Sequence, residues 1–212
     1  MSKHNAAAVL TRVYVASFPF ETDGGVVCAE RAREIADCAD GKTRQSKFYV
    51  WKLLEYALKS SFGSDADNVT FRKTADGKWT CDKCEFSLSH KDSLAAVAVS
   101  SLPVGVDIEK ITPERFDGKL QARILTENER SALSTLTPSE RSLCANILWA
   151  EKEAAFKRGG NGRFVANTVE TSANRTVLRK IRYGGGDYVL AVACGGAEEP
   201  TFYARGVEIC DL

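Results

Sequence analysis

The sequence predicts an α+β fold, and two kinds of segment carry this prediction. Residues 94–100 are continuously apolar and residues 104–109 alternate between apolar and other side chains, which are the patterns of buried and half-buried strands. Residues 47–59 and 145–157 instead place apolar side chains three and four positions apart, as amphipathic helices do. Strands and helices of this kind occur in both halves of the chain, so neither an all-helical nor an all-β fold is expected.

A third observation predicts that the two halves are similar. Ser93–Val99 and Tyr188–Cys194 are both apolar strand segments, and both contain Ala-Val-Ala at the same three positions. The turn Ser101-Leu102-Pro103 follows the first of them, and we place the boundary between the halves near residues 102–104. The prediction is therefore one half at residues 1–102 and a second half at residues 103–212.

The elements expected in the first half follow from local pattern. Residues 9–16 alternate as a strand, and the segment from Phe48 to Leu58 is largely apolar within its helical spacing. In chain order we expect a strand at 9–16, helices at 29–39 and 47–59, short strands at 69–73, 79–81 and 86–88, and the strand at 94–100.

The second half should begin with the strand that contains Asp107 and should include a helix around Trp149. Good helix formers fill this helix, and Gly159-Gly160 should end it. The other expected elements are helices near 118–124 and 127–135, and strands near Val165, at 177–183 and at 187–194.

Two carboxylates on the strand at 104–109 form the first candidate site. Alternation places Asp107 and Glu109 on one face, about 6–7 Å apart. Acidic side chains at this distance repel each other unless a cation lies between them, and oxygen-only ligands suit Mg²⁺. Gly105 lies on the same face and leaves room for a close approach by backbone or ligand. The alternative is a solvated strand face with ordinary acidic residues.

The helix around Trp149 supplies a third carboxylate and two lysines. Glu153 lies beside the apolar stripe, and Glu153 and Lys157 are one turn apart on the helix. Lys152 is the second lysine. In isolation, Glu153 and Lys157 could form an ordinary surface ion pair.

Together the two segments resemble a known family. Gly-Val-Asp-Ile-Glu at 105–109, followed by Trp-Ala-Glu-Lys-Glu-Ala-Ala-Phe-Lys at 149–157, resembles the signature of the 4′-phosphopantetheinyl transferase superfamily. Phe-Ser-Leu-Ser-His at 86–90 is similar to another motif of its larger, monomeric class, and Asp-Gly-Lys-Trp at 76–79 is similar to its Gly-Lys-Pro turn. Trp79 stands where the family usually has proline, and Ser87 where it has asparagine, which puts the local turn and one hydrogen bond in doubt.

The resemblance implies an architecture and a reaction. The fold would be two similar α/β subdomains related by a pseudo-twofold axis, with the active site in the cleft between them. The enzyme would transfer the 4′-phosphopantetheine arm of coenzyme A to a serine of an apo acyl or peptidyl carrier protein, releasing adenosine 3′,5′-bisphosphate. A chain with both halves would act as a monomer.

The resemblance also implies residue roles. Asp107, Glu109 and Glu153 would hold Mg²⁺, or Mn²⁺ in its place. Glu153 would act as the base for the serine, directly or through a metal-bound water, and Lys157 would stabilise charge on the leaving phosphate. Asp107 and His90 would belong to the catalytic residues together with Glu153 and Lys157. Contacts to coenzyme A are expected from Lys157 and from six further residues: Arg44, Gly77, Lys78, Ser89, His90 and Lys152.

Composition narrows the class of partner. The net charge is +1, so the basic imbalance of a nucleic-acid-binding domain is missing. We find no run of about 18 apolar residues, and the apolar part of the N-terminus is too short for a signal peptide. These patterns predict a cytoplasmic protein that uses neither nucleic acid nor membrane.

The cysteines suggest no disulfide framework. There are seven of them at irregular spacing. Cys81 and Cys84 form a single C-x-x-C, whereas a structural zinc site needs a second pair of ligands. A turn between two strands, with Asp82-Lys83 at its tip, is the other interpretation.

Two further functions remain open. One is a non-catalytic module that binds coenzyme A or a carrier protein. The other is a metal-dependent phosphohydrolase that uses the same acidic residues.

Overall fold

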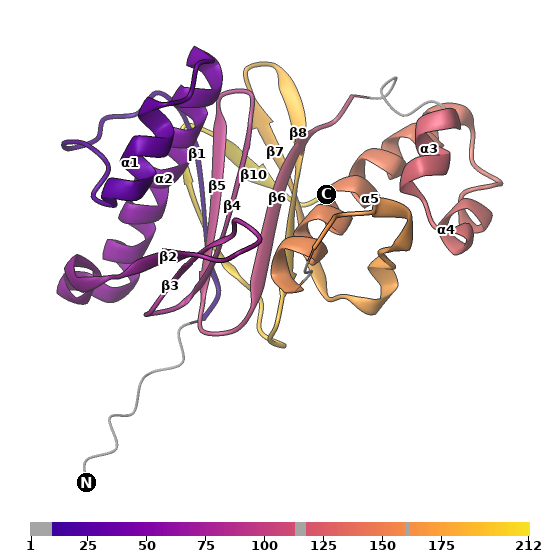
Figure 1. Ribbon diagram of the computed structural model, residues 1–212. Coiled ribbons are helices and arrows are strands. Elements are labelled where there is room, and N and C mark those ends of the chain that lie inside the picture. Colours follow the sequence, from indigo (N-terminus) through magenta and orange to yellow (C-terminus); the bar gives the residue numbers. More distant parts are fainter. Residues whose placement is uncertain (1–9, 113–117, 160–161) are drawn as a thin grey trace, which may run out of the picture.

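The computed structural model describes residues 10–112, 118–159 and 162–212. Two sheets lie face to face in the centre of the molecule, with helices covering the outer face of each (Figure 1). Side chains from both sheets fill the space between them, among them Val13, Leu94, Val106 and Leu190. Helix and sheet are thus mixed in both halves, which confirms the α+β class.

The first sheet has the strand order β4-β5-β1-β9. Its strands are β1 (Arg12–Ser17), β4 (Glu85–Lys91), β5 (Leu94–Ser100) and β9 (Thr201–Arg205). β5 pairs antiparallel with both β4 and β1, whereas β9 runs parallel to β1. Helices α1 (Ala29–Ala36) and α2 (Gly41–Phe62) precede the short hairpin of β2 (Phe71–Lys73) and β3 (Trp79–Cys81). Leu54, Trp51 and Val50 of α2 pack on this sheet.

The second sheet has the order β10-β7-β8-β6 and is antiparallel throughout. Its strands are β6 (Val104–Lys110), β7 (Thr176–Tyr183), β8 (Gly186–Cys194) and β10 (Glu208–Cys210). The helices are α3 (Gly118–Ile124), α4 (Glu127–Ala132) and α5 (Pro138–Gly159), of which α5 packs on β6 and β8.

Both halves use the same connection. A first strand is followed by helices and then by a hairpin whose second strand pairs with the first: β1, α2, β4 and β5 in one half, and β6, α5, β7 and β8 in the other. β9 is the exception, because it comes late in the chain but joins the first sheet beside β1. The pseudo-twofold axis and the boundary at residue 102 stay predictions.

The structure differs from the sequence prediction at several element ends and in three larger respects. The segment after Val165 is a short 3-10 helix (Ala166–Thr168) and not a strand, because two of its carbonyls turn inward to the buried Lys152. α2 begins earlier than predicted, at Gly41, where the Asp40 side chain accepts a hydrogen bond from the Thr43 amide as an N-cap. β9 and β10 were not predicted, since both are short and neither contains a buried residue.

In the described residues, no helix combines the length and apolar character needed to cross a membrane.

Candidate functional site

The candidate site lies where the two sheets meet at their edges. β4 is the edge strand of the first sheet and β6 is the edge strand of the second. Ser87 Oγ accepts a hydrogen bond from the Val106 amide at 3.0 Å, and Ser89 Oγ accepts one from the Ile108 amide at 3.3 Å. An edge strand leaves such amides unpaired, so these two serine hydroxyls join the sheets and fix the position of Asp107 between them.

Gly105 brings helix α5 directly onto β6. A Cβ at this position would lie 1.9 Å from the carbonyl oxygen of Ala154 and 2.7 Å from the amide nitrogen of Arg158. Only glycine allows this approach, so the room predicted at Gly105 is taken by the α5 backbone. The contact holds Glu153 and Lys157 above the strand that carries Asp107.

Lys157 is the centre of the resulting cluster. Its Nζ donates to Asp107 Oδ1 at 2.7 Å and to Ser89 Oγ at 3.2 Å, and it lies 3.9 Å from Glu153 Oε2. The Ser89 hydroxyl donates to the same Asp107 oxygen at 2.8 Å. Asp107 is only 2% exposed, and its second oxygen, Oδ2, is buried without a hydrogen-bond partner. The structure therefore brings three other predicted residues, Asp107, Ser89 and Glu153, around the Lys157 ammonium group.

Glu153 has a strongly altered acidity. Burial raises its pKa to about 7, repulsion from Asp107 and Glu109 adds to the increase, and attraction to Lys157 opposes it. A carboxyl group with such a pKa exchanges protons near neutral pH, which is the property needed in a general base.

Glu109 lies at the margin of this cluster. Its Oε2 pairs with Lys91 Nζ of β4 at 2.7 Å. Lys91 and Lys157 thus each pair with one of the carboxylates, Glu109 and Asp107. Within the described ranges, no group of three or more His, Cys, Asp or Glu side chains is close enough to hold a metal ion as it stands.

A cavity of about 300 Å³ adjoins the cluster. Three predicted residues line it: Gly77, Lys78 and Lys157. Lys78 Nζ donates to the carbonyl oxygen of Lys157 at 3.0 Å, which ties the β2–β3 hairpin to the end of α5. The rest of the lining is partly apolar and includes Trp79, Phe86, Leu88 and Phe156. Sequence analysis missed these apolar residues, although Phe86 and Leu88 belong to the motif that suggested His90.

His90 follows Ser89 on β4. Desolvation by the surrounding protein lowers its pKa, and the positive charges of Lys157 and Arg31 lower it further. The imidazole is therefore neutral near pH 7 and has one donor and one acceptor nitrogen. Arg31 is 9% exposed, its guanidinium lies 5.2 Å from the centre of the Trp51 ring, and its Nε is buried without a partner.

Two predicted residues lie outside the cluster. Arg44 is exposed, and its Nε and Nη2 both donate to the carbonyl oxygen of Cys38, which closes the connection between α1 and α2. Lys152 is fully buried, and its Nζ binds Glu129 Oε2 at 2.8 Å and two backbone carbonyls. Lys152 and Lys157 are five positions apart, about 140° around the helix, so they cannot share a face.

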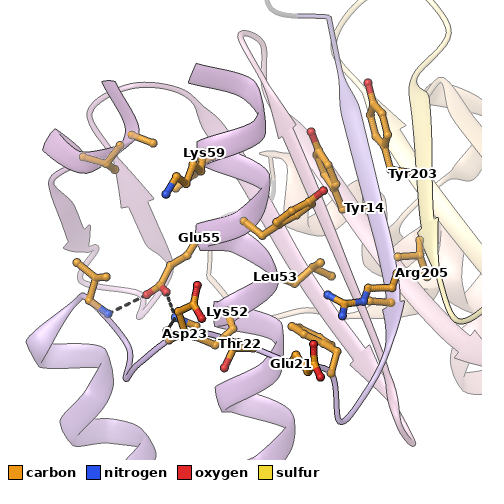
Figure 2. A pocket seen from close by; sticks show the side chains of 18 of the residues that line it. Tyr14, Glu21, Thr22, Asp23, Lys52, Leu53, Glu55, Lys59, Tyr203 and Arg205 are labelled. Atoms are coloured by element: carbon orange, nitrogen blue, oxygen red, sulfur yellow. Dashed lines mark hydrogen bonds and ion pairs between the residues drawn. The ribbon is translucent and has the colours of Figure 1, made fainter. Parts of the chain in front are cut away.

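A second, larger cavity of about 490 Å³ lies between α2 and the strands β1 and β9 (Figure 2). Tyr14 stacks on Tyr203 at 4.7 Å on the strand side, and Lys59 and Glu55 come from the helix. None of the predicted site residues is among the described residues that line it.

Comparison with known proteins identifies relatives of the chain. Residues 103–193 match the model of the 4′-phosphopantetheinyl transferase superfamily. The chain is 30% identical over 118 residues to 4′-phosphopantetheinyl transferase gsp of Aneurinibacillus migulanus, covering 54% of this chain and 49% of that protein. It is 29% identical over 113 residues to a 4′-phosphopantetheinyl transferase of Bacillus subtilis, covering 52% of this chain and 50% of the relative.

The third relative is 4′-phosphopantetheinyl transferase psf-1 of Bacillus pumilus, with 26% identity over 113 residues, 52% of this chain and 48% of that protein. The matches thus span about half the length of these relatives. β6, α5, β7 and β8, which carry Asp107, Glu153 and Lys157, all fall within residues 103–193 or end one residue beyond them. The family model and the three relatives confirm the predicted resemblance to the 4′-phosphopantetheinyl transferase superfamily, and the match to the family model covers residues 103–193.

Proposed function

We propose that this protein transfers the 4′-phosphopantetheine arm of coenzyme A to a serine hydroxyl of an apo carrier protein. One observation carries the proposal: the Lys157 ammonium contacts Asp107 and Ser89 and lies near Glu153, beside a cavity. Asp107, Glu153 and Lys157 belong to the segment that matches the transferase family. Transfer of a phosphoryl group requires a base for the attacking hydroxyl and a cation near the leaving phosphate, and this cluster offers both.

Glu153 is the proposed base. Its pKa of about 7 allows it to accept the serine proton near neutral pH. Lys157 is the proposed cation, since its side chain is 31% exposed and adjoins the cavity. Asp107 and Ser89 hold this ammonium group in place, so it does not have to reorganise when charge develops on the phosphate.

Coenzyme A would occupy the cavity of about 300 Å³. Lys78 and Gly77 from the β2–β3 hairpin would lie along one side of it, and Ser89 and the neutral His90 would hydrogen bond to its phosphates. Arg44 would bind the 3′-phosphate, because its contacts to Cys38 use only part of its donors. Lys152 is omitted from these contacts, because its buried ammonium already has three oxygen partners.

Asp107, Glu109 and Glu153 would have to move closer together to hold a divalent cation, because as they stand these described residues do not form a ligand group. Two observations support such a site. The orphaned, buried Oδ2 of Asp107 lacks any partner, and repulsion from Asp107 and Glu109 contributes to the raised pKa of Glu153. A cation near the three would give this Asp107 oxygen a partner, and an all-oxygen donor set suits Mg²⁺ or Mn²⁺. We therefore propose that Asp107, Glu109 and Glu153 would hold the metal, which when bound would neutralise charge on the pyrophosphate.

A single chain would suffice for this site. Ser89 and His90 come from β4 in the first half, whereas Asp107, Glu153 and Lys157 come from the second half. This arrangement supports the proposals that the protein acts as a monomer and that its two halves are related by a pseudo-twofold axis. The seven free cysteines fit a reducing compartment such as the cytoplasm.

The proposal is tested by incubating the protein with coenzyme A, Mg²⁺ and a panel of apo carrier proteins, and weighing the carriers by intact-mass spectrometry. We expect the mass of a carrier to increase by one phosphopantetheine on a serine. Glu153→Gln and Asp107→Asn should abolish the increase. Glu151→Gln is the matched control, because Glu151 lies on the same helix but is outside the cluster and should stay active.

The other outcomes separate the remaining functions. Binding of coenzyme A without any modified carrier would favour the non-catalytic module. Metal-dependent cleavage of a model phosphodiester, with no carrier present, would favour the phosphohydrolase. Either result would contradict the proposed transfer.

A further inference from the structure

Two cysteine side chains lie together at the turn between β3 and β4. The Sγ atoms of Cys81 and Cys84 are 3.6 Å apart, and the Cys81 Sγ also lies 3.3 Å from the Cys84 carbonyl oxygen. A disulfide requires about 2.05 Å between the sulfurs, so a movement of less than about 2 Å would bring them to bonding distance. Of the seven described cysteines, no other two are hydrogen bonded to each other.

The turn that holds this pair is fixed from outside. Asp82 Oδ1 accepts a hydrogen bond from the Thr70 amide at 2.9 Å, and the Asp82 amide donates to the Thr70 carbonyl at 3.3 Å. The turn that carries the two thiols is therefore held by Thr70, the residue immediately before β2, and is not a free loop. Both side chains are only partly buried, so small reagents can reach them.

The two thiols differ in acidity. A hydrogen bond from the Cys84 thiol lowers the pKa of Cys81 to about 6, despite the opposing effect of burial. The same interaction, together with burial, raises the pKa of Cys84. Cys81 would therefore be the attacking thiolate near neutral pH and Cys84 the resolving thiol.

Residues close to the pair along the chain line the cavity beside Lys157. Cys81 ends β3, two residues after Trp79, and Cys84 immediately precedes β4, whose Phe86 and Leu88 also line that cavity. The β2–β3 hairpin is otherwise tied to the end of α5 through Lys78. A covalent link between residues 81 and 84 would fix the hairpin relative to the strand that carries Ser89.

We propose that Cys81 and Cys84 are a reversible dithiol–disulfide site that sets the position of the β2–β3 hairpin against the cavity. The oxidant would be a low-molecular-weight disulfide. The Cys81 thiolate attacks one of its sulfurs, forming a mixed disulfide and releasing one thiolate. Cys84 then gives its proton to water and attacks the Cys81 sulfur, which closes the protein disulfide and releases the second thiolate. Two protein thiols are oxidised and one small disulfide is reduced to two thiols.

The same residues do not suffice for a zinc site. Structural zinc requires four ligands, and no group of three or more possible ligands is found in the part of the chain that the structure describes. Two thiols at contact distance instead match the geometry of an exchange reaction.

The site is tested by equilibrating the reduced protein in glutathione buffers of increasing oxidised fraction, then alkylating free thiols and mapping peptides by mass spectrometry. The peptide containing Cys81 and Cys84 should lose two hydrogens and resist alkylation at an oxidised fraction at least tenfold lower than any other cysteine requires. Dithiothreitol should reverse the change. Cys84→Ser should stop at a glutathione adduct on Cys81, whereas Cys144→Ser, a cysteine on α5, should oxidise as the parent protein does.

The effect on the cavity rests on the proposed function, so it is measured separately. Isothermal titration of coenzyme A into the reduced and oxidised forms should give dissociation constants that differ at least threefold, and Cys81→Ser should abolish the difference. Equal constants would overturn the control of the cavity. Failure to form the intramolecular disulfide, or tight binding of one zinc per chain lost in Cys81→Ser, would overturn the redox site itself. Formation of the disulfide in a protein that binds no coenzyme A in either form would leave the redox site standing and contradict the proposed function alone.

Discussion

Two lysines of helix α5, five residues apart, show how one sequence motif serves two different regions of the molecule. Lys152 is fully buried and binds Glu129 and the carbonyls of the segment after Val165. Lys157 is partly exposed and binds Asp107 and Ser89 at the edge of a cavity. Both ammonium groups face a carboxylate, but only one of them is open to a ligand.

The two lysines differ because different groups surround their ammonium groups. Lys152 is enclosed by protein oxygens, so its charge is compensated entirely within the fold and its loss would leave Glu129 without its buried cation. Lys157 lies at the seam between the two sheets, where the partners come from both halves. The comparison leads to a simple expectation: Lys152 determines stability and Lys157 determines activity.

The largest effect is expected from breaking the buried pair. Lys152→Met should lower the free energy of unfolding by about 3–5 kcal/mol, because it leaves Glu129 buried without its cation. Thermal or chemical unfolding monitored by circular dichroism measures this loss.

A double variant separates the effect of the unpaired Glu129 charge from the effect of the changed side chain at position 152. Lys152→Met combined with Glu129→Gln removes the uncompensated carboxylate but keeps an oxygen that can accept the Thr126 amide in the cap of α4. It should recover part of the loss. A double variant less stable than Lys152→Met would show that the lost carbonyl contacts, not the unpaired charge, dominate.

The next largest effect concerns the open lysine. Lys157→Gln should lower kcat/KM for carrier modification by about 10²–10³-fold, since it removes a preorganised cation from the proposed site. Its unfolding free energy should fall less than that of Lys152→Met, because Asp107 keeps the Ser89 hydroxyl as a donor and water can reach the position left by the 31% exposed lysine. Steady-state kinetics and an unfolding curve on the same preparation give both numbers.

Lys180→Gln is the matched control for the open lysine. Lys180 pairs with Asp187 on the hairpin of β7 and β8, away from the cluster. It should leave kcat/KM unchanged. A variant at Lys157 with full activity and low stability would reverse the assignment of the two lysines.

Only part of the contrast between Lys152 and Lys157 could be predicted from local sequence pattern. Alternation placed Asp107 on a strand, and helical spacing placed Glu153 and Lys157 one turn apart, so their side of the cluster was visible in the sequence. The burial of Lys152 could not be predicted from the sequence, because it depends on a 3-10 segment whose carbonyls turn inward only in the folded chain. β9 was missed for a similar reason: its pairing with β1 joins residues far apart in the sequence and leaves most of its side chains exposed.

A smaller effect is expected where α5 meets β6. Gly105→Ala places a methyl group against the Ala154 carbonyl and must push the helix away, which should cost about 1–3 kcal/mol of unfolding free energy. The shift would also separate Lys157 from Asp107, so activity should fall with stability. Gly41→Ala, at a position with no atom within 4 Å of the added carbon, should change neither. Full activity of Gly105→Ala would mean that the contact is not needed to hold the cluster.

The smallest expected effect distinguishes Ser87 from Ser89, the two serines that join the two sheets. Ser87→Ala removes the acceptor of the Val106 amide and should lower the unfolding free energy by about 1–3 kcal/mol, the cost of a buried donor without a partner. Ser89→Ala removes a similar backbone contact and also the contacts to Asp107 and Lys157, so it should reduce kcat/KM more than Ser87→Ala does at a comparable loss of stability. The ratio of kcat/KM between Ser87→Ala and Ser89→Ala therefore measures how much activity depends on Ser89 holding the Lys157 ammonium group in place. Equal rates would show that the ammonium group keeps its place through Asp107 alone, and that Ser89, like Ser87, serves only to join the two sheets.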